Sequence, residues 1–173
     1  VFKEEATRIP GVQFISKMKE SPTVIGHTTS DIEWAKRNPN EQVSFSDAAV
    51  GYDFVKTLKL QLKAGRDFSK DFADSANYLV NETAAAKMGF KDPVGEYISM
   101  GGIKGKIVGV LRDFHFNSMH QAIEPLVIRF ADNQKWGTIL LRLQADKANS
   151  VIPQLEKLSK NLNPDFTFSY AFS

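Results

Sequence analysis

The chain has 173 residues, of which 42% are hydrophobic and 24% charged, a balance that is typical of globular proteins and excludes an intrinsically disordered chain. Its 22 basic and 20 acidic residues alternate along the sequence and give a formal charge of +2, so no basic run marks a nucleic-acid site. The absence of cysteine excludes disulfides, thiol catalysis and cysteine-ligated metals.

The first third of the chain predicts a helix, a strand and a hairpin. Apolar residues recur at helical spacing over the first nine residues, and Pro10 and Gly11 predict the end of this helix. The strand "VQFISKM" (12–18) follows. Apolar residues then alternate on both sides of the polar stretch "AKRNPNEQ" (35–42), which predicts a β-hairpin.

The middle of the chain, about 51–116, predicts a compact α+β unit. Asn81 is placed to cap a helix that Gly89 ends. The glycine-rich stretch within "YISMGGIKGKIVGVL" predicts a tight turn between two strands. The predicted elements are a short helix at 54–58, strands at 60–62 and 78–80, a helix at 82–88, and two strands within 97–111.

The last third predicts a β-α-β unit. A strand "TILLRLQ" (138–144) precedes a helix with apolar residues at helical spacing, which Ser150 is placed to cap and Asn163 and Pro164 to end. Aromatic residues alternate in "FTFSYAF" (166–172), which predicts a final strand whose aromatic face covers a helix layer. The uncapped first helix and the abrupt end of this strand predict that the sequence is part of a longer protein. No apolar run approaches the roughly 20 residues of a membrane span, so we expect this segment by itself to be soluble.

One cluster of polar residues, "LRDFHFNSMHQAIEP" (111–125), offers candidate metal ligands. Asp113, His115, His120 and Glu124 are ligand types for zinc or another transition metal. The two histidines are five residues apart, however, which on a helix separates them by about 140°. We therefore favour a structural interpretation, in which alternation buries Phe114 and Phe116 and leaves the polar pair outside.

Three further features are also best explained structurally. Glu82 lies in the first turn of a predicted helix, where an acidic side chain stabilises the helix dipole. "MGGIKGK" (100–106) lacks the pattern of a phosphate-binding loop and predicts a hairpin turn. Trp34, near the tip of the predicted polar hairpin, is a candidate partner contact if it is exposed, and an ordinary buried tryptophan is the alternative.

Three motifs in order resemble one family. The chain resembles the extracytoplasmic core domain of MacB-like and FtsX-like ABC-transporter permeases in the motifs "VGYDFVKTLKLQLKAGRDFS", "LVNETAAAKMGFKDPVGEYI" and "KIVGVLRDFHFNSMHQAIEPLVI". These sequences are especially similar to those of permeases from Bacteroidetes. The resemblance covers about residues 12–173. It implies an α+β fold of two subdomains: a porter-like β-α-β part from 1–50 and 117–173, and a small sabre-like α+β part inserted at 51–116.

The resemblance also implies a function. We expect a non-catalytic domain without a cofactor, outside the bacterial inner membrane in an integral membrane protein, that couples cytoplasmic ATP hydrolysis to export or mechanotransmission. The implied partners are a second permease subunit, a cytoplasmic ATP-binding subunit or domain, and an adaptor or a lipoprotein or peptide substrate. Asp113, Phe114, His115 and Phe116 match the family's "DFHF" pattern and are expected to form a structural junction.

Two alternatives from other classes stay open. One is a sensory or ligand-binding ectodomain of a membrane protein. The other is a metal-dependent hydrolase that uses Asp113, His115 and His120.

Overall fold

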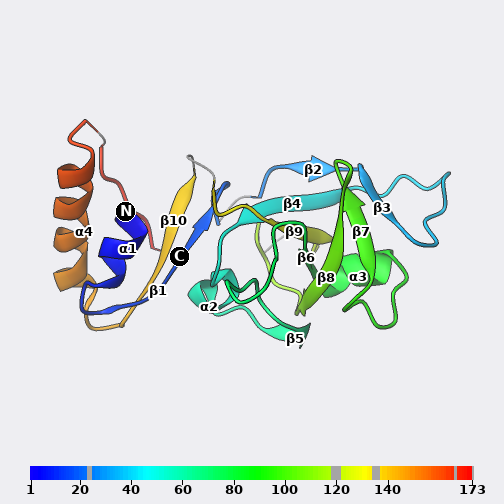
Figure 1. Ribbon diagram of the computed structural model, residues 1–173, viewed down its shortest axis with the longest axis horizontal. Helices are drawn as coiled ribbons and strands as arrows, with labels where there is room; N and C mark the ends of the chain where they lie inside the picture. The colour runs from blue at the N-terminus through cyan, green and yellow to red at the C-terminus, as the bar shows by residue number, and fades with distance from the viewer. Residues whose placement is uncertain (23–24, 118–121, 134–136, 166, 173) are drawn as a thin grey trace.

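A mixed β-sheet runs through the length of the molecule, with helices at its two ends and at its middle (Figure 1). The computed structural model describes residues 1–22, 25–117, 122–133, 137–165 and 167–172. Its helices are α1 (Phe2–Thr7), α2 (Phe54–Leu58), α3 (Glu82–Lys87) and α4 (Ala148–Leu162). Its strands are β1 (Val12–Met18), β2 (Thr28–Thr29), β3 (Ile32–Trp34), β4 (Phe45–Val50), β5 (Leu62–Gly65), β6 (Tyr78–Asn81), β7 (Tyr97–Met100), β8 (Ile103–Leu111), β9 (Leu126–Phe130) and β10 (Thr138–Leu143).

The strand order of this sheet mixes distant parts of the sequence. Among the described strands the order is β10-β1-β4-β9-β6-β8-β7-β3, while β2 pairs with β4 and β5 with β8. The pairs β4/β9 and β6/β8 are parallel, and the other pairs are antiparallel. The mixed sheet and the few helices confirm the predicted α+β class.

The central strand β4 is buried along its whole length, as is usual for a parallel strand covered on both faces. Its two polar side chains therefore need partners. The Ser46 hydroxyl donates to the Glu124 carboxylate at 2.8 Å, and the Asp47 carboxylate lies against the His27 ring and 3.9 Å from Arg129 Nε.

One end of the molecule is a distinct unit, which we call the end unit: α1, β1, β10 and α4. Its own apolar cluster includes Ala6, Ile15, Val151 and Leu155, and Figure 1 shows both helices beside the β1/β10 ribbon. The ladder from β1 to the rest of the sheet has a single residue pair, Met18 with Val50. The end unit is thus joined to the remaining sheet at a narrow point.

The remaining elements, which we call the main unit, share two larger apolar clusters. One gathers around α2 and includes Phe54, Phe68 and Phe116. The other lies between α3 and the β7/β8 strands and includes Phe45 and Ile98. Met18 and Leu140 of the end unit also join the first cluster, so apolar packing supplements the narrow ladder between the two units.

One predicted hairpin and one predicted strand are wrong. The hairpin expected around 35–42 does not form, because β3 pairs antiparallel with β7 and β4 pairs with β9. In the C-terminal segment a strand was expected over 166–172, but residues 167–172 belong to no strand. Alternation alone predicted a strand there, whereas a strand also needs a hydrogen-bonded neighbour.

Of the helix caps that the sequence predicted, one is confirmed and one is wrong. The predicted Asn81 cap is confirmed, since its side chain accepts a hydrogen bond from the Ala84 amide at 2.9 Å. Ser150 is not the cap of α4, because the helix begins earlier, after Lys147, and the Ser150 hydroxyl donates to the Lys147 carbonyl. Strand β9 was not predicted at all.

The sheet also runs across the predicted domain boundaries. β9, which falls in the expected porter-like part, pairs with β4 on one edge and with β6 of the inserted part on the other. The division into 1–50, 51–116 and 117–173 therefore stays a prediction.

We expect Phe116→Ala to lower the free energy of unfolding by about 3–5 kcal/mol, because its ring is 5% exposed and belongs to the main apolar cluster. Phe114 is only partly buried, so Phe114→Ala should cost about half as much. Chemical denaturation measures both, with the exposed His115→Ala as a control expected to change stability by less than about 0.5 kcal/mol. Equal small losses at both phenylalanines would contradict the packing described.

Candidate functional site

The segment that leaves β8 is anchored to the start of α3 through Asp113. Its carboxylate accepts hydrogen bonds from the Thr83 amide at 3.0 Å and the Thr83 hydroxyl at 2.7 Å. In return, the Asp113 amide donates to the Glu82 carboxylate at 3.0 Å. Both oxygens of Asp113 are thus engaged by groups of the chain itself.

Glu82 extends this anchor to β5. Lys63 Nζ lies 2.7 Å from its carboxylate, and the hydrogen bonds from Lys63 and from the Asp113 amide hold the pKa of Glu82 below its usual range. Because these groups face solvent, the ion pair contributes little to stability. Glu82 therefore has a positioning contact as well as the helix-dipole role expected from the sequence.

The most deeply buried polar group of this region is the Asn81 side chain, which is 0% exposed. Its Oδ1 accepts from the amides of Ala84 and Leu126, both at 2.9 Å, and its Nδ2 donates to the Glu124 carbonyl at 2.8 Å. One side chain therefore begins α3 and fixes the start of β9. The sequence indicated only the first of these two roles.

The "DFHF" segment alternates as expected. Phe116 is buried, Phe114 is partly buried with the two ring centroids 5.6 Å apart, and His115 is exposed. Asn117 continues the anchoring, since its Oδ1 accepts from the Ile25 amide at 3.0 Å. The segment is thus tied to the chain before β2 as well as to α3.

The geometry does not assemble the metal site that the sequence offered as an alternative. Asp113 is engaged by Thr83, His115 points away from the core, and His120 lies outside the described residues. Within the described part of the chain, no group of three His, Asp or Glu side chains is close enough to hold a metal ion. That the domain binds no metal stays a prediction.

Trp34 is not the exposed aromatic that a partner contact would use. It is 9% exposed and packs edge-on against Phe45 at 5.7 Å, with the Arg37 guanidinium 5.3 Å from its ring. The alternative of an ordinary buried tryptophan is confirmed. The reason is the pairing of β3 with β7, which turns Trp34 into the main unit.

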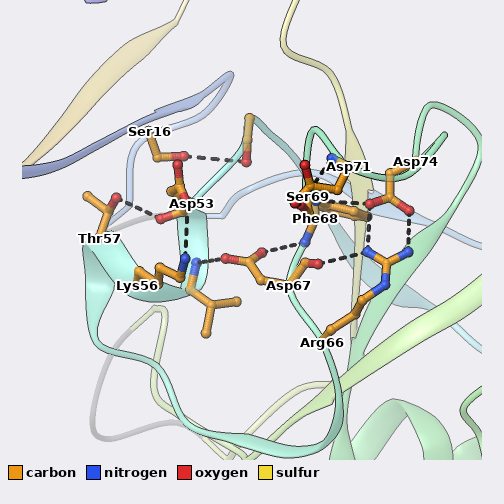
Figure 2. A network of polar contacts seen from close by, with 12 residues as sticks. Ser16, Asp53, Lys56, Thr57, Arg66, Asp67, Phe68, Ser69, Asp71 and Asp74 are labelled. Carbon is orange, nitrogen blue, oxygen red and sulfur yellow. Dashed lines mark hydrogen bonds and ion pairs between the residues drawn. The ribbon is translucent and has the colours of Figure 1, made fainter. Parts of the chain in front are cut away.

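A polar network that the sequence did not predict organises the loop between β5 and β6 (Figure 2). Arg66 makes a bidentate pair with Asp74, at 2.7 and 2.9 Å, and Asp74 also accepts from the Ser69 amide and the Asn77 side chain. Burial would raise the pKa of Asp74, but the hydrogen bonds from Arg66, Asn77 and Ser69 together hold it below its usual range. The buried Asp74 carboxylate therefore fixes the conformation of the loop through hydrogen bonds to Arg66, Ser69 and Asn77.

Asp67 links the same loop to α2. Its carboxylate accepts from the Val55 amide at 3.0 Å and from the Phe68 amide at 2.8 Å, as Figure 2 shows. Burial raises the pKa of Asp67 to about 6, against the opposing effect of these hydrogen bonds. The sequence gave no signal that this loop aspartate would be half-buried against α2.

A hollow of about 320 Å³ opens where β4 and β9 end. Tyr52 and Phe130, whose ring centroids are 4.4 Å apart, form its aromatic wall, and Asp132 and Ser75 add polar groups. Asp132 also lies 3.7 Å from Lys3 of α1. The hollow therefore borders the joint between the end unit and the main unit.

Asn81→Ala should destabilise the protein by about 2–4 kcal/mol, because it removes a helix cap and leaves the Leu126 amide and the Glu124 carbonyl buried without partners. Urea unfolding followed by circular dichroism measures this loss. The exposed Asn40→Ala is the matched control and should stay within about 0.5 kcal/mol of the wild type. A loss below about 1 kcal/mol at Asn81 would contradict the assigned contacts.

Asp67→Asn should change how stability depends on pH. The folded protein binds the Asp67 proton with a pKa of about 6, above the roughly 3.9 of an unfolded chain, so its contribution is present below about pH 4 and is lost as the pH rises through 6. The stability of the variant relative to the wild type should therefore rise by about 1–2 kcal/mol between pH 4 and pH 7, after allowance for partial exposure. Denaturation at each pH tests this, with the exposed Asp71→Asn expected to give a flat difference.

Comparisons with known proteins agree on one family. The sequence matches the MacB-like periplasmic core domain over residues 3–158. Among proteins of curated function, none matches the sequence.

Three solved structures share the fold. The periplasmic region of MacB from Actinobacillus actinomycetemcomitans has a TM-score of 0.65 at 16% identity, covering 93% of this chain and 72% of that one. The extracellular domain of the ABC-type transporter YknZ from Gram-positive bacteria has a TM-score of 0.65 at 14% identity, covering 94% and 82%. A domain of a permease protein from Porphyromonas gingivalis has a TM-score of 0.60 at 18% identity, covering 91% and 73%.

No helix among the described residues is both long and apolar enough to cross a membrane. Because the family match spans most of the sequence, the chain belongs to the family of MacB-like periplasmic core domains of ABC-transporter permeases.

Proposed function

We propose that this domain has no catalytic role and that it couples ATP hydrolysis in the cytoplasm to movements outside the membrane, for export or mechanotransmission. The observation that carries the proposal is the narrow joint between the end unit and the main unit, where the ladder has one residue pair, Met18 with Val50. The end unit has an apolar cluster of its own and shares only Met18 and Leu140 with a main-unit cluster, and two units joined in this way are suited to hinge motion.

Few polar contacts would have to change in such a motion. The joint has two backbone hydrogen bonds, from the Lys19 amide to the Ala49 carbonyl and from the Gly51 amide to the Lys17 carbonyl. The Ser16 hydroxyl also donates to the Gly51 carbonyl at 3.4 Å, and Lys3 Nζ lies 3.7 Å from the Asp132 carboxylate. Beside them, Arg142 Nε donates to the Thr57 carbonyl at 2.8 Å. Each such bond contributes only about 1 kcal/mol net, so their rearrangement lies within the free energy of ATP-driven steps.

The junction at Asp113, Phe114, His115 and Phe116 has a place in this proposal. It would keep the main unit rigid while the end unit moves, because Asp113 is bonded to the start of α3 and Phe116 is packed in the core. The saturation of Asp113 by Thr83 supports this structural role over a reactive one.

The proposed partners follow from the family. A second permease subunit would face this domain across the transporter, and a cytoplasmic ATP-binding subunit or domain would drive it through the membrane helices. An adaptor, or a lipoprotein or peptide substrate, would contact it outside the membrane. Since Trp34 itself is buried, a partner at this end would meet the exposed loop that follows it, residues 38–42.

Distance measurements in the intact permease test the coupling. Spin labels at Gln154 on α4 and Lys104 on β8, both exposed, report on the two units, and the absence of cysteine in the chain makes labelling within this domain selective. We expect the distance distribution to shift between the nucleotide-free and the ATP-trapped transporter, and the shift to vanish in an ATPase-inactive variant. A label pair within the end unit, Gln154 with Thr7, is the control and should stay unchanged. An identical distribution in both states would contradict the proposed hinge.

A further inference from the structure

The hollow at the ends of β4 and β9 gathers polar side chains that the chain itself does not use. Within the described part of the chain, no group hydrogen-bonds to the side chains of Tyr52, Ser75 or Asn133, all of which line the hollow. The nearby Asp74 carboxylate, by contrast, accepts from several donors of the chain. The hollow therefore offers a ligand hydrogen-bonding groups that the neighbouring polar network does not.

The Asp132 carboxylate gives the hollow its charge. Among the described residues that line it, Asp132 is the one charged residue. Lys3 Nζ lies 3.7 Å from this carboxylate, which is longer than a hydrogen bond. The carboxylate packs closely over Gly51, since a Cβ at that position would lie 2.5 Å from Asp132 Oδ1. Asp132 thus lies at a defined place and keeps acceptor sites for a donor from outside.

The aromatic wall of the hollow suits a cation. The rings of Tyr52 and Phe130 lie 4.4 Å apart, and an ammonium or guanidinium group is attracted to the face of such a ring. The exposed Lys70 Nζ already lies 5.8 Å from the Tyr52 ring centroid. The volume of about 320 Å³ is close to the lower limit for small-molecule sites, so the hollow suits one basic side chain on its apolar stem.

The loop beside the hollow carries an exposed aromatic side chain. Phe72 is 53% exposed, and the Arg66 guanidinium lies 3.8 Å from its ring centroid. The bidentate contact of Arg66 with Asp74 fixes this loop (Figure 2). Single exposed apolar side chains are common on protein surfaces. An aromatic side chain on a fixed loop beside a pocket is nevertheless typical of a protein contact, because little conformational entropy is lost when it binds.

The spacing of these two features favours a polypeptide over a small amine. Phe72 is three residues from Ser75 of the hollow, so their Cα atoms lie at most about 11 Å apart. An extended peptide of about five residues spans this distance. A small amine would fill the hollow and leave Phe72 exposed, whereas a polypeptide can contact both.

We propose that the hollow binds a lysine or arginine side chain of a partner polypeptide. Asp132 accepts hydrogen bonds from its charged group, and Tyr52 and Phe130 lie against that group. Phe72 packs against an apolar residue of the same segment. The partner is therefore a protein segment that carries basic and apolar residues close together. The proposal rests on these contacts and not on the proposed hinge.

Nuclear magnetic resonance titrations of the 173-residue chain test the site with N-acetyl-arginine amide. We expect saturable shifts of the amides of residues 51–53, 75 and 130–132, and binding of the neutral N-acetyl-citrulline amide that is at least about tenfold weaker. Asp132→Asn should weaken the arginine probe by a similar factor, whereas Asp146→Asn, an exposed change of the same charge on the end unit, should not. The citrulline comparison uses the unaltered chain, so it does not depend on the folding of a variant.

Three results would overturn the site: no saturable shift at these amides, equal binding of the arginine and citrulline probes, or unchanged binding of the arginine probe to Asp132→Asn.

A second titration distinguishes a polypeptide from a small cation. The peptide acetyl-Ala-Leu-Arg-Leu-Ala-amide should bind at least about tenfold more tightly than N-acetyl-arginine amide, because it also contacts Phe72. Phe72→Ala should remove this gain and leave the binding of N-acetyl-arginine amide unchanged. Equal affinities of peptide and single residue, or a gain that persists in Phe72→Ala, would overturn the assignment to a polypeptide. Neither titration bears on the hinge, which the spin-label distances test separately.

Discussion

The buried amide of Asn81 is the interaction on which the main unit depends. Its oxygen accepts hydrogen bonds from both the first turn of α3 and the start of β9, and its nitrogen donates to the Glu124 carbonyl. Aspartate would lose the donor, and serine is too short to reach three segments. Since β9 lies between β4 and β6, fixing where β9 starts also fixes the register of both pairings at the centre of the sheet.

The polar groups around this point share one property: their hydrogen-bonding atoms already have partners within the chain. The Asp113 carboxylate accepts hydrogen bonds from Thr83. The Asp74 carboxylate accepts from Arg66 and two further donors, and the Asn117 side chain accepts from the Ile25 amide. A catalytic group must keep an atom free for its substrate. These contacts support the proposed structural role of the segment around Asp113.

Local signals in the sequence were predictive because they act within one turn or one strand. The Asn81 cap and the burial of Phe116 follow from residues a few positions apart. The pairing of β3 with β7 joins segments more than sixty residues apart, and nothing in the alternation around Trp34 distinguishes that partner from a nearby one. The half-buried Asp67 was missed for a related reason, since its partner is the Val55 amide of α2, twelve residues earlier, and no local pattern around Asp67 predicts that contact.

The contrast between the two units has a mechanical meaning. Within the main unit, ladders from β4 to β3 continue without a break and side-chain anchors tie the loops to them, so a displacement there must break many contacts at once. At the joint, the polar links that a rotation would disturb include two backbone hydrogen bonds, the Arg142 contact, the Ser16–Gly51 hydrogen bond and the Lys3–Asp132 ion pair. Deformation concentrates where the fewest contacts resist it. In the proposed function, force applied to the end unit would change its angle to the main unit before it changed the shape of either, as the proposed transmitting role requires.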